Sequence, residues 1–322
     1  MGYNAFGQLG TSNTQVYLQT PTLATFFAND PVKDVKANFY NLLVLTESGK
    51  VYMTGWDGFR LKGDGTTTDA GYIQEFRQVP FPTGVNVQSI SLGFSAAAAL
   101  DSNGNAYTWG YNYEYATGQG INTLYTYAPT IINPDGVKFE KAEIAASGLA
   151  VVEGGKDLYA WGVRRNVGME VTAYDTRPTL RTSTLGLAQD ETIVNINIGS
   201  AIPVEVPYLH PSFVITDKRV LTSGYNFYGR SGVVEPGGAI RYELNGNTSG
   251  NNSFYEIQGH AIYEGTQFLG ATVGYFHTIL WTGTNALNAA YNYTGYGTSG
   301  LSDWYMSDGG GSHTSVFTKI IE

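Results

Sequence analysis

The sequence predicts an all-β fold, a β-propeller of four-stranded antiparallel blades, and three observations support this prediction. A glycine-rich loop recurs along the chain, a β-hairpin pattern precedes each copy of it, and no segment keeps a helical period. Tandem units of four short strands are typical of propeller blades, because radial packing hides most strand edges. A solenoid of stacked sheets is the alternative, and it would need similar repeats with distinct end caps.

The recurring loop is clearest in residues 107–120, which read YTWGYNYEYATGQG. Related copies follow one another at intervals of roughly 53, 55, 52, 62 and 66 residues, a period long enough for a whole supersecondary unit. The glycines that mark the copies are Gly2, Gly55, Gly110, Gly162 and Gly224, and Ala290 takes the glycine place in the last one.

The first and fifth copies match closely, since residues 2–10 and 224–232 both read Gly-Tyr-Asn-x-aromatic-Gly-x-x-Gly. Asn and Asp can bond to the backbone two residues on, and Gly adopts backbone angles that other residues resist. We therefore expect the pattern to specify a loop geometry. Its Asn or Asp position is occupied by Asn4, Asp57, Asn112, Asn226 and Asn292.

A two-strand pattern precedes each loop, in residues 41–55, 96–110, 149–162, 212–224 and 278–290. Each has an apolar run, a short polar turn such as SG, NG or GG, and a second β-prone run, which is a hairpin signature. A further short strand is expected before each hairpin. A fourth is expected after the loop, in TPTLATF, FRQVPF, APTIIN and RPTLRTS.

Five complete units and an incomplete sixth can be recognised, and we expect residues 1–322 to form a single propeller domain. The chain starts at a glycine loop and ends in SVFTKIIE, which resembles the strand after such a loop. Either the two ends combine into one blade, or the ring stays open or is completed by another chain. Residues 190–212 and 233–273 are expected to contain insertions, polar surface loops such as YELNGNTSGNNSFYEIQG.

The charge composition limits the classes of partner. Only 14% of residues are charged, the formal net charge is −9, and no cluster of Lys or Arg stands out. Nucleic-acid binding and binding to an anionic membrane both need clustered positive charge, so neither is expected. Cys is absent, and the N-terminus has no signal-peptide pattern. Our localisation hypothesis is association with a virion after cytoplasmic synthesis.

Several segments resemble the regulator of chromosome condensation repeat family. They are GFSAAAALDSNGNAYTWGYN (93–112), GYFHTILWTGTN (274–285) and GYNAFGQLG at the start. His210 and His277 lie where that family's repeat has its His, so a structural hydrogen bond is expected of them rather than catalysis. The resemblance implies a propeller, usually of seven blades. It also implies, as an alternative function, guanine-nucleotide exchange or other regulation of a small GTPase.

Candidate chemical sites are weak in this sequence. DSNGN (101–105) resembles the start of a calcium loop but has no Glu at the twelfth position. The glycine loops do not match G-x-x-x-x-G-K-[ST], so no nucleotide cradle is expected. No catalytic constellation, metal site or cofactor site is recognised, and we predict a protein that is not an enzyme.

Aromatic residues beside the repeat loops are the candidate binding positions, because Tyr and Trp anchor protein interfaces and stack on sugars. Half or more of them could instead pack between neighbouring blades. Arg164 and Arg165 join the candidates because they interrupt the repeat pattern. The aromatic candidates are Trp56, Phe59, Tyr113, Tyr115, Phe227, Tyr228, Tyr293, Trp304 and Tyr305.

The leading functional hypothesis is a non-enzymatic structural or interaction propeller that presents these loops to a protein or glycan partner. A specific version is a bacteriophage virion component, a tail or receptor-binding part, which fits a Cys-free, Tyr-, Asn-, Gly- and Thr-rich chain of low charge. The alternatives are the small-GTPase regulator and a carbohydrate-binding or glycoside-cleaving propeller. Cleavage would need two positioned carboxylates, and the sequence pairs none.

Overall fold

The described part of the computed structural model is an array of β-sheets. It comprises residues 1–12, 15–163, 167, 174–199, 211–224, 254–257, 267–273, 277–282, 286–292 and 312–321. For residue 277 and the last two of these segments, only backbone positions are described. No helix in these segments is long and apolar enough to span a bilayer.

The described residues form five four-stranded antiparallel sheets, each built from strands consecutive in the chain. The first sheet contains β3 (Val32–Ala37), β4 (Asn41–Thr46), β5 (Val51–Trp56) and β6 (Tyr72–Gln78). The second contains β7 (Val87–Leu92), β8 (Ala96–Asp101), β9 (Ala106–Tyr111) and β10 (Tyr125–Ile131). The third contains β11 (Phe139–Ile144), β12 (Ser147–Val152), β13 (Leu158–Val163) and β14 (Tyr174–Leu180).

The last two sheets follow the same order. The fourth contains β15 (Ile193–Ile198), β16 (Pro211–Thr216), β17 (Val220–Gly224) and β18 (Tyr255–Glu256). The fifth contains β19 (Gly270–Val273), β20 (His277–Trp281), β21 (Ala286–Asn292) and β22 (Ser312–Ile321). A two-stranded sheet precedes them, β1 (Gly2–Tyr3) with β2 (Tyr17–Leu18). Short 3-10 turns lie at η1 (Thr25–Phe27), η2 (Tyr113–Tyr115) and η4 (Thr182–Thr184).

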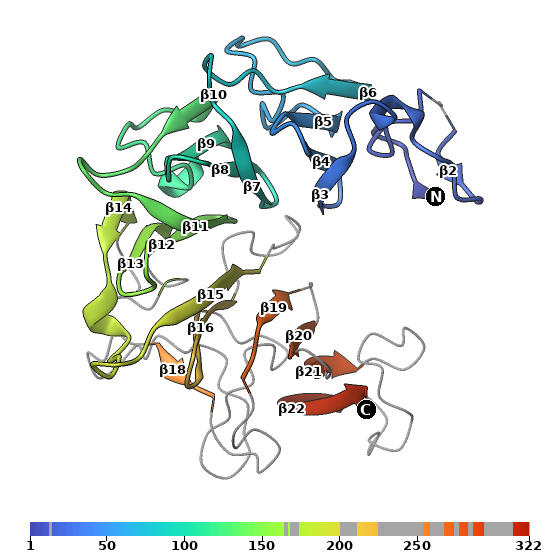
Figure 1. The fold of residues 1–322 in the computed structure, drawn as a ribbon. Coiled ribbons are helices and arrows are strands. Elements are labelled where there is room, and N and C mark those ends of the chain that lie inside the picture. The colour runs from blue at the N-terminus through green and yellow to red at the C-terminus, as the bar shows by residue number, and fades with distance from the viewer. Residues whose placement is uncertain are drawn as a thin grey trace.

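The sheets are arranged as propeller blades rather than as a stacked solenoid. Figure 1 shows them in an arc around a common centre, with the first strand of each, β3, β7, β11, β15 and β19, nearest that centre. The first and fifth sheets lie at the two ends of the arc. The all-β prediction and the four-stranded antiparallel blades are therefore confirmed, whereas a closed ring is not observed among the described residues.

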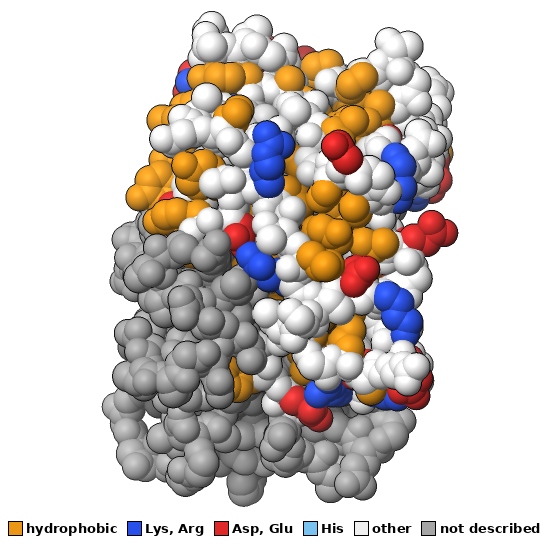
Figure 2. Space-filling model, turned by 90° about the vertical axis from the view of Figure 1, so that its left-hand side faces the viewer, with side chains coloured by type: hydrophobic (Ala, Val, Ile, Leu, Met, Phe, Trp, Pro, Cys, Tyr) orange, Lys and Arg blue, Asp and Glu red, His pale blue; other side chains and the backbone are white. Residues whose placement is uncertain are grey.

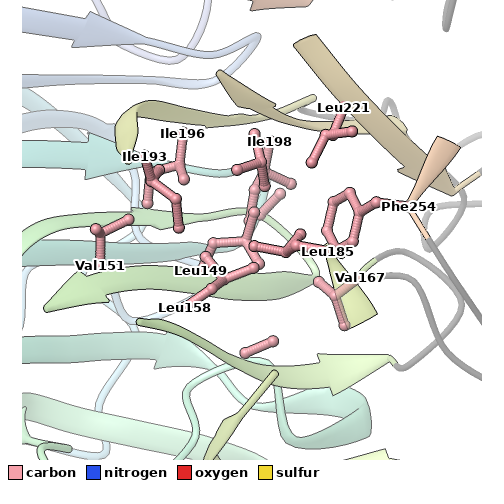
Figure 3. Packing of buried hydrophobic residues seen from close by; sticks show 13 residues of the cluster. Leu149, Val151, Leu158, Val167, Leu185, Ile193, Ile196, Ile198, Leu221 and Phe254 are labelled. Carbon is pink, nitrogen blue, oxygen red and sulfur yellow. The ribbon is translucent and has the colours of Figure 1, made fainter. Parts of the chain in front are cut away.

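Neighbouring sheets pack through apolar side chains on their facing surfaces. Figure 3 shows one such layer, in which Leu149, Val151 and Leu158 of the third sheet meet Ile193 and Ile196 of the fourth. Burying a side chain of this size contributes roughly 1.5–3 kcal/mol. Because each layer joins two consecutive sheets, it fixes where the loops of one sheet lie on the next.

Three expectations about strands need correction. TPTLATF does not form a fourth strand: the pairing strand is β2, just before it, and η1 begins within it. The segment expected as a polar insertion supplies β18, which pairs with β17. The C-terminal strand β22 pairs with β21 and completes the fifth sheet, while β1 pairs with β2, so no sheet among the described residues combines strands from both ends.

Candidate protein-binding face

The Asn or Asp of each described repeat loop organises its own loop. The Oδ1 atom of Asn4 accepts from Leu9 N at 2.9 Å, that of Asp57 from Lys62 N at 3.1 Å, and that of Asn112 from Thr117 N at 3.1 Å. The acceptor is five residues before the donor in every case, and all three acceptor residues are buried.

The loops also share left-handed backbone positions. Gly10, Gly63 and Gly118 have φ of 61°, 61° and 64° at one repeat position. A second repeat position is occupied by Gly7 in the first loop, by Arg60 in the second and by Tyr115 in the third. Arg60 and Tyr115 have φ of 63° and 61°. Left-handed geometry is unfavourable for residues with a Cβ, so both non-glycine residues are held there by the rest of the loop.

Each loop docks on the following sheet. The Nε1 atom of Trp109 donates to Leu61 O at 2.9 Å, and that of Trp161 donates to Ala116 O at 2.8 Å. The first loop docks on the first sheet, where Thr54 Oγ1 donates to Gly7 O at 2.7 Å. A loop therefore belongs to the surface of two neighbouring sheets.

This docking joins aromatic residues into one connected surface, which we call the aromatic face. Phe6 lies 4.7 Å from Tyr40 between ring centroids, Tyr40 lies 5.2 Å from Trp56, and Trp56 lies 4.9 Å from Phe59. Phe59 continues the series to Tyr111 at 5.7 Å. The aromatic face comprises Tyr3, Phe6, Tyr17, Phe39, Tyr40, Trp56, Phe59, Tyr72, Phe94, Tyr111, Tyr113 and Tyr125.

Several members of the aromatic face are open to solvent. Phe39, Tyr72 and Tyr113 are 52%, 56% and 40% exposed, whereas Trp56 and Phe59 are half-buried. Exposed Tyr and Phe in contact with half-buried rings form a surface of low conformational entropy, which suits protein binding.

Charge is sparse on this face and largely compensated. The guanidinium of Arg60 lies 5.0 Å from the centroid of Tyr125, and its Nη1 atom is 3.3 Å from Asp69. The buried Lys62 lies 3.4 Å from Asp57. Figure 2 shows the same character on the side that lies at the left of Figure 1, where hydrophobic side chains gather among uncharged atoms and charged ones are scattered.

The structure brings together three of the predicted binding residues, Trp56, Phe59 and Tyr113. Tyr115 is separate: it packs on Tyr174 of the third sheet, 6.0 Å between centroids. The binding role of all four remains a prediction. The other candidates lie outside the described residues: Arg164, Arg165, Phe227, Tyr228, Tyr293, Trp304 and Tyr305.

The sequence analysis missed the other members of the aromatic face. Phe6 shares a loop position with Phe59, and Phe39 shares the turn after the first strand with Phe94. Aligning these two positions between repeats would have indicated the aromatic contacts across the sheets, such as that of Phe59 with Phe94 at 5.1 Å.

Of the residues expected to be structural, the glycines all have positive φ. Gly2, Gly55, Gly110, Gly162 and Gly224 have φ of 120°, 110°, 110°, 82° and 95°. The backbone of His277 pairs with Ala290, and its side chain is not described. His210 and Asn226 lie outside the described residues.

One unusual carboxyl lies on β11, the strand of the third sheet nearest the centre of the arc in Figure 1. Ser91 Oγ of β7 donates to Glu143 Oε2 of β11 at 2.5 Å, and Ile144 N donates to the same Oγ at 3.0 Å. Burial raises the pKa of Glu143 to about 7, against the lowering effects of the Ser91 hydrogen bond and of Lys36. The contact joins two blades, and Lys36 and Asp34 of β3 are the other charged groups that act on this carboxyl.

DSNGN forms a hairpin turn around a carboxylate. Asp101 accepts from the backbone of Asn103 and Asn105, and from the hydroxyl of Tyr107 at 3.2 Å. Burial and the neighbouring Asp101 raise the pKa of Tyr107 to about 12. In the described part of the chain, no three His, Asp or Glu side chains gather as metal ligands.

Comparison with known proteins identifies the repeat. The model of the Regulator of chromosome condensation (RCC1) repeat matches residues 87–116, which run from β7 into the loop after β9. The Ultraviolet-B receptor UVR8 of Arabidopsis thaliana is 25% identical over 144 residues, which are 44% of this chain and 32% of the receptor. The guanine nucleotide exchange factor SRM1 of Saccharomyces cerevisiae is 28% identical over 147 residues, 41% of this chain and 30% of that protein.

Solved structures extend the likeness over the chain. The crystal structure of Prp20p from Saccharomyces cerevisiae superimposes with a TM-score of 0.72 at 17% identity, covering 99% of this chain and 71% of that one. At this identity the likeness shows a common fold. The two curated relatives match this chain over only about a third of their own length.

Proposed function

The chain belongs to the family of proteins built from regulator of chromosome condensation repeats, and on that premise we propose that it is a non-enzymatic propeller that binds a protein partner through its aromatic face. The observation that carries the proposal is the continuous series of ring contacts from Tyr3 to Tyr113, in which exposed rings contact half-buried ones. A partner that covers Phe39, Tyr72 and Tyr113 would bury rigid apolar area at small entropic cost.

The candidate partner that we favour is a small GTP-binding protein. SRM1 is named as a guanine nucleotide exchange factor, and the Prp20p structure is reported together with binding to Gsp1p and histones. For this chain, nucleotide exchange is the more specific proposal, and protein binding through the aromatic face is the more general one.

Two measurements separate these proposals. Candidate GTP-binding proteins loaded with a fluorescent nucleotide are mixed with the chain, and both complex formation and nucleotide release are followed. Phe39→Ala and Tyr113→Ala should each weaken the complex about tenfold, as expected for interface anchors. Leu180→Ala, an equally exposed apolar residue on β14, is the matched control and should leave binding unchanged.

The outcomes are distinct. Binding without nucleotide release would refute exchange and keep the interaction proposal. Equal binding by the Phe39, Tyr113 and Leu180 variants would refute the aromatic face as the binding surface.

The virion hypothesis gains no support from the relatives described above, none of which is named as a virion protein. Glycan binding by the exposed rings remains a prediction, which a glycan array with the same three variants would test.

A further inference from the structure

A cation lies against the aromatic face at a position where the repeat does not require one. Arg60 occupies the place that Gly7 and Tyr115 hold in the neighbouring loops, and its φ of 63° is left-handed. Because Gly7 builds the same loop without a side chain, the backbone alone does not explain an Arg here. Backbone strain of this kind is often found at ligand-binding positions.

The guanidinium of Arg60 makes its hydrogen bonds through a single nitrogen atom. Nη1 donates to Asp57 O at 3.0 Å and to Gly58 O at 3.3 Å. Among the described residues, the buried Nε has no acceptor, and Nη2 donates to no atom. Nε and Nη2 form the edge of the guanidinium that matches the two oxygens of a carboxylate, and this edge is not satisfied within the described structure.

Asp69 shows that a carboxylate at the surface can reach this guanidinium. Its side chain is 44% exposed, and its Oδ2 atom lies 3.3 Å from Arg60 Nη1. A charge-assisted hydrogen bond is usually about 2.7–2.9 Å long, so this ion pair is loose. The Oδ1 atom of Asp69 accepts from Gly71 N at 2.7 Å, so its own turn holds Asp69 in place. Asp69 therefore offsets the charge of Arg60 without filling the Nε–Nη2 edge.

A series of rings connects the guanidinium with the exposed part of the aromatic face. Arg60 Cζ lies 5.0 Å from the ring centroid of Tyr125, which is 5.4 Å from that of Tyr111. Tyr111 in turn stacks on Tyr113 at 5.9 Å, and Tyr113 is 40% exposed. An Arg that stacks on a ring is already restricted in its motion, and Arg is enriched among the residues that dominate interface energies.

We propose that Arg60 binds a carboxylate of the protein partner, from an Asp or Glu that lies beside the partner's apolar contact residues. This inference rests on the proposed function, since it assigns a chemistry to the partner of the aromatic face. The carboxylate accepts from Nη2 and, once the guanidinium has turned on Tyr125, from Nε. A purely apolar partner would remove water from these donors without replacing it, which is unfavourable, so charge complementarity selects an acidic partner.

The first probe is phenylacetate, which joins a ring to a carboxylate, and neutral phenylacetamide is its matched control. Heteronuclear NMR of the isotope-labelled full chain follows the Nε signal of Arg60, which Arg60→Lys identifies by its loss. We expect a saturable shift of this signal with phenylacetate and none with phenylacetamide. This measurement needs no protein partner, so its outcome is independent of the proposed function.

Two variants locate the carboxylate. Asp69→Asn should strengthen phenylacetate binding about threefold, because it removes a competing surface carboxylate. Asp64→Asn is the control: it neutralises an equally exposed carboxyl of the same loop, but Asp64 pairs with Lys62, so binding should not change. If Asp69 and Arg60 formed only a structural ion pair, Asp69→Asn would not strengthen binding. Thermal unfolding checks that both variants remain folded.

A GTP-binding protein that forms the complex described above extends the test to a protein partner. Arg60→Lys keeps the charge but loses the fork of donors, so it should weaken that complex about tenfold. Weakening by Phe39→Ala without weakening by Arg60→Lys would refute the carboxylate contact and retain the aromatic face as the binding surface. Equal binding by both variants and the parent chain would refute the aromatic face as well.

The small-molecule arm has its own contrary results. The absence of a saturable shift with phenylacetate would overturn the inference, and so would equal shifts with phenylacetamide, which would mean that the rings alone bind. Inorganic phosphate is the third probe. Tighter binding of phosphate than of phenylacetate would assign Arg60 to a phosphate group instead of an Asp or Glu.

Discussion

The indole of Trp161 donates from Nε1 to the backbone carbonyl of Ala116 at 2.8 Å, and this bond ties the loop after the second sheet to the third sheet. Trp109 makes the equivalent bond to Leu61 one sheet earlier. Both indoles are fully buried. The repeat thus uses Trp to position the loop of the preceding sheet, so a buried residue of the scaffold controls the geometry of the surface loop.

Trp161→Phe should destabilise the protein by about 1–3 kcal/mol, because it leaves the Ala116 carbonyl unpaired in a buried place. Urea unfolding of the two proteins measures the difference. Trp56→Phe is the control. Because Trp56 is half-buried at the end of β5, this substitution should lower the free energy of unfolding by less. Equal losses at both positions would show that ring size, and not the hydrogen bond, determines the effect.

Gly118→Ala should be more destabilising than Gly65→Ala. Both glycines have left-handed φ, 64° and 81°, so each substitution carries roughly 1 kcal/mol of backbone strain. A Cβ on Gly118 would also lie 2.7 Å from Trp161 Cδ1, whereas one on Gly65 would meet nothing within 4 Å. Thermal unfolding of the pair isolates the clash, and indistinguishable midpoints would contradict the docked geometry of the loop.

Glu143→Gln should remove a dependence of stability on pH. The pKa of Glu143 is raised by burial from 4.5 to about 7, so the folded state retains a proton that the unfolded state has lost. Stability due to this group is therefore present below about pH 4.5 and falls as the pH rises to about 7.

The Gln variant keeps a neutral partner for Ser91, so it should be more stable than the parent chain at pH 8, by roughly 1–3 kcal/mol. Partial exposure of the side chain favours the lower end of that range. The measurement is the free energy of unfolding between pH 5 and 8. Glu47→Gln, an exposed carboxyl, is the control and should change the profile little.

Ile90→Ala and Val35→Ala should differ in cost although the residues are equivalent in the repeat. Ile90 is buried between two sheets, and its truncation should cost about 2–5 kcal/mol. Val35 is exposed on β3, so its truncation should change stability by about 0.5 kcal/mol or less. Chemical denaturation measures both, and similar costs would mean that the face of β3 is covered in solution.

The sequence by itself determined the repeated unit. The spacing of Gly55, Gly110 and Gly162 and the hairpin before each reflect local geometry, since a left-handed residue and a two-residue turn are specified within a few positions. The observed fourth strands begin earlier than the sequence predicts. The strand expected in FRQVPF begins four residues before it, at Tyr72, and the strand expected in APTIIN begins three residues before it, at Tyr125. Strand bounds depend on pairing with a neighbour, which a local pattern does not contain.

Only the tertiary structure decided which aromatic residues share a surface. Phe59 meets Phe94 because the loop after the first sheet docks on the second, and Tyr115 contacts Tyr174 because the loop after the second sheet docks on the third. Only the tertiary structure shows that Val32 and Val35 are exposed, since their spacing in the sequence is the same as that of the buried Val87 and Ile90. A sequence pattern marks an apolar residue for burial, but whether anything covers it depends on the neighbouring sheet.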